Sequence, residues 1–565
     1  MPEKIIETRT CTKCQIPFDI TDRDKEFYDK VSPIFAWQKC AIPAPTLCPE
    51  CRRQRRILFR NHRKLYHRKS DLSWKDIISI FSPDKPYTVY NQKERWSDEY
   101  DPYQYGRDFD FSRPFFDQFE ELLKDVPHIG TVITNAENCD YNVFCVDSKN
   151  CFLSQRVAES EDIAYSYLVI NKCKDCVDCL HILTCEHCYE LIDCDNCVQS
   201  LYSQNCSTCY NIAFCYECHG CNNCIWCISL NNKSYCIFNQ QYSKEEYEQR
   251  SKEFDYSASG VATLHKLFQE KKNTSIHKEN ANSRVEHVLW DRIVNSKDIM
   301  YGFEVDDVET GKYIFGCHTG KDMMDADFSY VGDKVYEHMS TSHGNSVGFS
   351  VISNESSHIW YSLYSANSHN LFGCACMRDG SYAILNKKYS KDEYEEMVLK
   401  IIEHMKTTGE WWQFFPAKLS TFWYNETAAM EYYPLTKDEA MKKWFKRSDY
   451  QTPAPKADKI VKAKDLPNTI EEVTDDVLNR AIECEISWNL FKIIKPELEF
   501  YRRYKIALPR RHQDVRHMDR MARRNPMKLW DRTCNKCWIA IKTSYAPERP
   551  EIVYCEDCYN KEIYW

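Results

Sequence analysis

The middle of the sequence carries cysteine at a nine-residue spacing, and this spacing constrains the fold more than any other feature. Cysteines recur every nine residues from Cys179 to Cys224, and a second such series runs from Cys209 to Cys236. So short a period is typical of solenoids, in which each repeat stacks on the one before it. We therefore predict a β-solenoid-like fold with two nine-residue repeats in each coil. The twelve-residue spacing from Cys139 to Cys151 suggests a coil of another shape at the start.

The solenoid-like region is duplicated. The segment Ser234–Gln249 matches Ser381–Glu396 at ten of sixteen positions, at an offset of 147 residues. In both segments a Ser-Lys-x-Glu sequence, starting at Ser243 and at Ser390, predicts a capping box that opens a helix. We expect two repeats of the same design, each followed by a helix.

The second copy indicates what the cysteines of the first copy do. At the same offset, Cys206 and Cys215 correspond to serine, and Cys224 corresponds to Leu371. These residues do not replace a thiolate ligand, but they do replace a small inward side chain, and free cysteine behaves as a small hydrophobe with a weak donor. This favours cysteines stacked in a core. A metal or iron–sulfur centre in the first copy alone is the alternative.

A second duplication relates the two ends of the chain. Eleven of 35 positions are identical between 60–94 and 524–558, at an offset of 464 residues. Each end contains two modules in tandem, and a complete module has two Cys-x-x-Cys pairs. The N-terminal end keeps all four cysteines in its first module, and the C-terminal end keeps all four in its second. We infer two tandem zinc ribbons that were duplicated, with one metal site lost from each copy. The intact sets are Cys11, Cys14, Cys48 and Cys51, and Cys534, Cys537, Cys555 and Cys558; the degenerate sets are Ser70, Ser73, Asn91 and Glu94, and Cys484, Ser487, His512 and Val515.

Four thiolates suit zinc, because the ion accepts tetrahedral sulfur and four sulfur ligands leave no position for a substrate. We therefore predict two structural zinc ions per chain, with Cys40 as a spare thiol near the first site. The predicted organisation is 1–70 (intact ribbon with a basic strip), 71–133 (degenerate ribbon and helical connector), 134–242 (cysteine-rich solenoid repeat), 243–290 (helix and polar insertion), 291–388 (second solenoid repeat), 389–470 (helix, aromatic connector and linker), 471–532 (degenerate ribbon with a basic strip) and 533–565 (intact ribbon).

Two basic strips stand out in a chain whose net charge is −9. Residues 52–69 hold nine Lys or Arg and no acid, and residues 502–532 hold eleven against three Asp. Such strips are typical of surfaces that follow a phosphate backbone. The alternative is that the arginines pair with the acidic body of the protein. The candidate nucleic-acid-binding residues are Arg52, Arg53, Arg55, Arg56, Arg60, Arg63, Lys64, Arg516, Arg520, Arg523, Arg524 and Lys528.

The 31 cysteines raise the question of compartment. The start of the chain lacks the apolar stretch of a secretory signal, and no run of about 18 apolar residues predicts a membrane span. With Cys-x-x-Cys pairs present, these observations favour reduced, metal-binding thiols and a cytoplasmic protein with no membrane partner.

No catalytic constellation stands out. The sequence has only 14 glycines and neither a phosphate-binding glycine loop nor a zinc-protease motif. Cys317 and His318 are neighbours in the sequence, but adjacent strand residues point to opposite faces, which argues against a catalytic dyad there. Three hypotheses follow: a non-enzymatic zinc protein that binds nucleic acid or the ribosome through its basic strips, a scaffold that binds a protein partner through the solenoid, and an enzyme of unknown class.

Five segments resemble a family of bacterial zinc-ribbon proteins with a cysteine-rich repeat, found in small-genome bacteria: CPECRRQRRILFRNHRKLY, DFDFSRPFFDQF, SYCIFNQQYSKEEYE, FWYNETAAMEYYPL and APERPEIVYCEDCY. The resemblance implies zinc and a repeated cysteine-rich middle, and it implies no activity. The predicted fold class is thus α+β and multi-domain, with zinc ribbons at both ends flanking a duplicated β-solenoid-like middle with interspersed helices.

Overall fold

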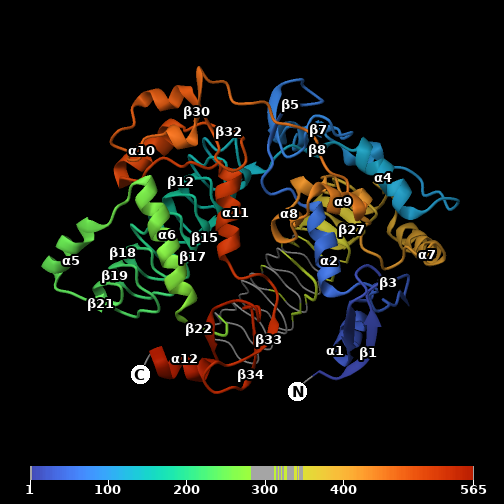
Figure 1. Cartoon of the computed structure of the whole chain (residues 1–565). Coiled ribbons are helices and arrows are strands. Elements are labelled where there is room, and N and C mark those ends of the chain that lie inside the picture. The colour runs from blue at the N-terminus through green and yellow to red at the C-terminus, as the bar shows by residue number, and fades with distance from the viewer. Residues whose placement is uncertain are drawn as a thin grey trace.

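The fold is a mixed arrangement of helices and many small sheets, shown in Figure 1. No helix among the described residues is long and apolar enough to cross a membrane. The neighbours Cys317 and His318 and much of the second repeat, predicted at 291–388, lie outside the described residues. The computed structural model describes residues 3–280 and 348–563 and, between them, 311, 312, 316, 320, 323–327, 336–339, 341 and 342.

The cysteine-rich region folds into short parallel strands stacked side by side, which we call the first ladder. Stacked strands are related by twelve residues, as in the pairing of Lys174 with Glu186 and of Asn222 with Ser234. At one point the stacked residues are thirteen apart, as Glu161 and Lys174 are. The extra residue lies near Asn171 and Lys172, which both have positive φ. The strands are β9 (Ile133–Thr134), β10 (Val143–Val146), β11 (Gln155–Ala158), β12 (Glu161–Ala164), β13 (Tyr167–Ile170), β14 (Lys174–Val177), β15 (Leu180–Leu183), β16 (Glu186–Tyr189), β17 (Ile192–Asp195), β18 (Tyr210–Ala213), β19 (Asn222–Ile225) and β20 (Ser234–Ile237), followed by the antiparallel β21 (Gln240–Gln241).

The expected pair of nine-residue repeats per coil is wrong, because stacked residues lie twelve apart. The nine-residue spacing instead marks a contact between neighbouring rungs. The thiol of Cys176 donates to the carbonyl oxygen of Cys185 at 3.4 Å, and the thiol of Cys185 donates to that of Cys194 at 3.7 Å. Each thiol therefore contacts the next strand of the stack. The residue that accepts from it lies three positions before the residue that is stacked on the cysteine itself.

A second ladder repeats this design. Ser350 pairs with Ser362 and His369 with Ser381, again twelve residues apart. Each ladder ends in a two-residue hairpin strand and a helix, and the predicted capping boxes at Ser243 and Ser390 are confirmed. The described strands are β23 (Thr341–Ser342), β24 (Ser350–Asn354), β25 (Ser357–Trp360), β26 (Ser362–Ala366), β27 (His369–Phe372), β28 (Ser381–Ile384) and β29 (Lys387–Lys388); the helices that follow the ladders are α5 (Lys244–Arg250), α6 (Ala258–Asn273) and α7 (Lys391–Thr407).

The cysteines of the first ladder form its core. All eighteen from Cys139 to Cys236 are buried in one cluster. In the second ladder Ser353 and Ser362, which correspond to Cys206 and Cys215, are buried as well. All cysteines in the described part of the chain are free thiols. The structure therefore agrees with small inward side chains stacked in a core.

The ends of the chain contain four units of one design, a β-hairpin followed by a helix. At the tip of each hairpin one residue has positive φ: Gln15, Trp74, Trp488 and Trp538. These tips lie at corresponding places in the duplicated modules. The units are β1 (Ile5–Thr10), β2 (Pro17–Thr21) and α2 (Pro49–Arg56); β5 (Tyr66–Lys69), β6 (Asp76–Ser79) and α3 (Gln92–Arg95); β31 (Arg480–Glu483), β32 (Leu490–Phe491) and α11 (Gln513–Arg523); and β33 (Trp530–Thr533), β34 (Ala540–Thr543) and α12 (Glu556–Ile563).

The end units pack against the ladders, and connecting segments fill the space between them. In Figure 1, α11 lies beside β15 and β17, and α2 lies near the second ladder. The helical connector predicted within 71–133 contains α4 (Phe115–Asp125), and the ring of Phe119 stacks on that of Phe415 in the aromatic connector. The remaining elements are α1 (Asp22–Val31), β3 (Ile34–Phe35), β4 (Gln38–Lys39), β7 (Val89–Tyr90), β8 (His128–Ile129), β22 (Ile276–Lys278), α8 (Ala429–Tyr432), α9 (Lys437–Lys442), β30 (Lys459–Lys462), α10 (Lys495–Tyr504) and β35 (Ile552–Tyr554).

Two of these elements tie distant segments together. The strand β22, in the polar insertion, pairs in parallel with β35 of the last ribbon. The strand β30 lies near the end of 389–470, the region predicted to end in a linker, and pairs in parallel with β31. Part of that segment is thus built into the sheet of the third end unit.

Candidate metal centres and the basic strips

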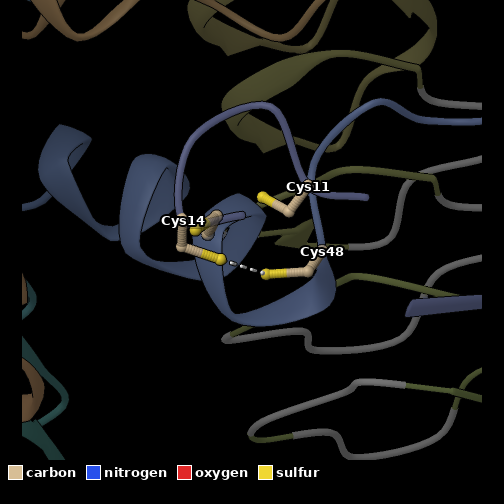
Figure 2. Close-up of side chains that lie close together, drawn as sticks. Cys11, Cys14 and Cys48 are labelled. Carbon is tan, nitrogen blue, oxygen red and sulfur yellow. Dashed lines mark hydrogen bonds between the residues drawn. The ribbon is translucent and has the colours of Figure 1, made fainter. Parts of the chain in front are cut away.

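The first candidate metal centre joins a hairpin tip to the start of a helix. Cys11 and Cys14 occupy the tip between β1 and β2, where the N–H of Gln15 bonds the carbonyl of Cys11. Cys48 is the N-cap of α2 and Cys51 lies in its first turn. The four sulfur atoms lie within 4.8 Å of one another, and Cys14 Sγ is 3.6 Å from Cys48 Sγ. Figure 2 shows the sulfurs of Cys11, Cys14 and Cys48 facing a common point.

The last ribbon contains the same arrangement. Cys534 and Cys537 lie at the tip between β33 and β34, and Cys555 and Cys558 lie at the start of α12. All four sulfurs are within 4.8 Å of one another, and Cys537 Sγ is 3.6 Å from Cys555 Sγ.

Backbone N–H groups stabilise a negative charge on the sulfur of Cys534. It accepts the N–H groups of Lys536, Cys537 and Cys555 at 3.3–3.5 Å. Burial raises the pKa of this thiol, but these amide donors outweigh burial and lower the pKa to about 6. A thiolate is the form that binds metal. In a tetrahedral zinc site, bonds of about 2.3 Å place the sulfurs about 3.8 Å apart, so both groups fit such an ion.

The degenerate units keep the same frame with at most one of the four sulfurs, that of Cys484. In the second unit Ser70 hydrogen-bonds Glu94, and Asn91 caps α3. Burial raises the pKa of Glu94, but hydrogen bonds from Ser70 and Ser73 lower it more. In the third unit Cys484 accepts the N–H of Ser487 at 3.4 Å. Side-chain and backbone hydrogen bonds thus hold the two degenerate hairpin tips at the positions where the intact units place four thiols that could bind a metal.

The basic strip of the N-terminal module faces carboxylates. Arg52 and Arg56 are buried, at 3.0 Å from Asp325 and 2.6 Å from Asp327 respectively. The next pairs are Arg55 with Glu337 at 2.7 Å, and Arg63 and Lys64 with Asp514 at 3.0 and 2.5 Å. Only part of the strip is helical, because α2 ends at Arg56.

The strip of the C-terminal module is paired in the same way, here with the first ladder. Asp178, fully buried, receives both Arg516 and Arg520, the latter at 2.8 Å. Arg523 lies 2.9 Å from Glu190, and Arg524 lies 2.8 Å from Asp193.

The three remaining candidate residues lie over aromatic rings. Arg53 lies over Tyr432 at 5.4 Å, Arg60 over Phe144 at 4.7 Å and the exposed Lys528 over Trp530 at 5.1 Å. Of the twelve candidate residues, nine therefore pair with carboxylates, and the other three contact rings. Contact with a phosphate backbone stays a prediction.

Sequence reasoning missed the partners of the strips. The carboxylates that receive the arginines come from far along the chain, and Asp178 is one turn residue among many in the first ladder. It also missed a buried cluster in which Glu431 lies 3.6 Å from His517 and 4.0 Å from His62. A third group of converging thiols, Cys139, Cys145 and Cys151, had the twelve-residue spacing as its only sequence indication.

No protein-family model matches the chain, and no curated protein is similar to it in sequence. One solved structure, “putative acetyltransferase from Desulfovibrio desulfuricans G20”, matches 40% of this chain and 46% of its own, at 10% identity and a TM-score of 0.09. That likeness is too slight to carry an argument about fold. The two four-cysteine groups are consistent with zinc-ribbon-like motifs.

Proposed function

We propose that this chain is a non-enzymatic zinc-binding scaffold. Its two four-thiolate groups each hold one structural zinc ion. Its ladders close into coils of twelve residues and form a rigid body on which the end modules are docked. The body and the exposed ribbon tips then bind a protein partner.

The observation that carries the proposal is the pairing of both basic strips with the ladders and the segments beside them. Arg56 and Arg520 are fully buried, and both end on carboxylates. Removing one partner from such a buried pair costs about 3–5 kcal/mol, because the other charge is left uncompensated. Arginines held in this way join elements of the same molecule, and reaching a phosphate backbone would require breaking those pairs.

The hairpin tips favour a protein partner. Trp74, Trp488 and Trp538 occupy equivalent tip positions with positive φ, and each is 70–74% exposed. Exposed aromatic side chains are enriched where proteins bind one another. Three tips of one design would present three such side chains.

The test reverses the charge of the strip and follows two properties. The triple variant Arg55→Glu, Arg56→Glu, Arg63→Glu should lose thermal stability, while the control Lys69→Glu, Lys75→Glu, Lys542→Glu changes the charge equally at exposed positions and should not. Neither the wild type nor the variants should retain RNA or DNA at about 0.1 M salt, where charges still act over about 10 Å.

Nucleic-acid or ribosome binding predicts the opposite pattern. The wild type would retain nucleic acid, with an affinity that falls steeply as salt rises. The arginine variant would lose that retention and keep its stability. This result would replace the scaffold proposal.

A further inference from the structure

Three thiols converge at the start of the first ladder, outside both ribbons. The sulfur atoms of Cys139, Cys145 and Cys151 lie within 4.8 Å of one another, and all three residues are buried. Cys139 and Cys151 lie twelve residues apart, the spacing of stacked residues, and Cys145 lies midway between them along the chain. Asn142 fixes this frame, because its amide nitrogen donates to the carbonyls of Cys139 and Cys151 at 2.8 and 2.6 Å.

Cys145 differs from the other ladder cysteines in what its thiol faces. Seventeen of the eighteen donate their S–H to a backbone carbonyl, as Cys188 does to Glu186 at 3.1 Å. Among the described hydrogen bonds Cys145 has no such carbonyl, and its thiol interacts with the side chains of Cys151, Cys139 and Ser148. Backbone carbonyls therefore orient the other seventeen ladder thiols, whereas the thiol of Cys145 is directed at two other sulfurs.

A hollow in the surface lies beside this group. Its lining includes Glu137 and Ser148, whose backbone carbonyls both accept from the thiol of Cys139, and a further ladder cysteine, Cys173. Five carboxylates and three lysines line it, so its wall carries an excess of negative charge that attracts cations. The carboxylates are those of Glu137, Asp147, Glu159, Glu161 and Glu186.

We propose that Cys139, Cys145 and Cys151 form a third metal site, one for a soft monovalent ion such as Cu(I) in three-coordinate sulfur. Soft thiolate ligands select Cu(I), and three sulfurs with no fourth protein ligand suit it better than a structural zinc ion, which takes four. The ion enters through the acidic hollow, and the protons of the coordinating thiols leave to solvent by the same route. This site is independent of the scaffold proposal.

The test is an anaerobic titration of the zinc-loaded chain with Cu(I) against a competing chelator. The copper content and the zinc content are both measured in each sample. The wild type should take up one copper per chain and keep its zinc. Cys145→Ser should weaken copper binding at least tenfold. The control Cys188→Ser makes the same change at a thiol that already donates to a carbonyl, and it should bind copper as the wild type does.

Three results would overturn the proposal: copper that merely displaces zinc, copper retained by Cys145→Ser, or an equal loss in both variants. X-ray absorption at the copper edge of the wild-type chain supplies a test that does not depend on the folding of a variant. It should show three sulfur ligands, and two sulfurs or nitrogen ligands would contradict the assignment.

Discussion

A left-handed backbone conformation recurs at every third residue of the first ladder, from Asp175 through Asp178 and His181 to Gly220. For a residue other than glycine this conformation costs about 1–2 kcal/mol, so other interactions must offset it. The residue that follows most of these turns is an inward cysteine or serine that donates to the carbonyl two residues before it, as Cys176 does to Lys174 at 3.2 Å. In the second ladder Ser362 makes the same bond to Trp360 at 3.0 Å. Cysteine and serine are interchangeable there because both are small donors.

The first prediction separates these cysteines from metal ligands. Cys206→Ser should leave the zinc content unchanged and cost at most about 1 kcal/mol, because the carbonyl of Gln204 remains within reach of the new hydroxyl. Cys534→Ser should lose one zinc and unfold the last ribbon. Elemental analysis and thermal unfolding measure both. Loss of metal in the Cys206 variant would place a metal in the ladder core.

The second prediction concerns Asp178. Asp178→Asn removes the charge shared by two buried arginines and should destabilise the protein by about 3–5 kcal/mol. The control Asp531→Asn breaks a pair with Lys542 in which the Asp531 side chain is 85% exposed, and it should cost less than about 1 kcal/mol. Denaturant unfolding of the two variants measures the difference. Equal costs would show that Asp178 does not hold the C-terminal module to the ladder.

At the scale of elements, much of the end modules could be predicted from the sequence. The duplication placed four related units, and the spacing of Cys11, Cys14, Cys48 and Cys51 predicted which thiols meet, because hairpin tips and helix starts are local structures. The rung spacing could not be read from cysteine alone. Nine residues separate a thiol from the carbonyl that it meets, whereas twelve separate stacked strands. The docking of the arginines depends on pairs more than 200 residues apart, such as Arg52 with Asp325, which no local pattern shows.

The third prediction restores a lost site. The second unit keeps its hairpin tip at Trp74 and its capped helix at Asn91. The quadruple variant Ser70→Cys, Ser73→Cys, Asn91→Cys, Glu94→Cys should therefore bind one more zinc than the wild type. The matched control Ser70→Ala, Ser73→Ala, Asn91→Ala, Glu94→Ala should gain none. An unchanged zinc content in a folded cysteine variant would mean that this unit has lost the ribbon geometry.

At the scale of the whole molecule, burial of histidine between the modules makes stability depend on pH. Burial lowers the pKa of His62, His265, His277 and His517 to about 4 in each case. The unfolded chain, with histidine pKa values near 6.5, binds these protons first as the pH falls.

The fourth prediction follows from that difference. Stability contributed by the neutral histidines is fully present above about pH 6.5 and is lost as the pH falls toward 4. The thermal midpoint should therefore decrease across this window. His517→Gln, which cannot be protonated, should reduce the slope with pH, and a slope equal to that of the wild type would contradict the assignment. The exposed His369 provides the control in His369→Gln, which should leave the slope unchanged.

We infer that two of the four end units hold a zinc ion and that the other two have replaced the metal with hydrogen bonds. Elemental analysis of the reduced, copper-free chain tests this inference. We expect two zinc ions per chain, falling to one in Cys534→Ser and to one in Cys11→Ser. A wild-type value near four, or no loss in either variant, would contradict it.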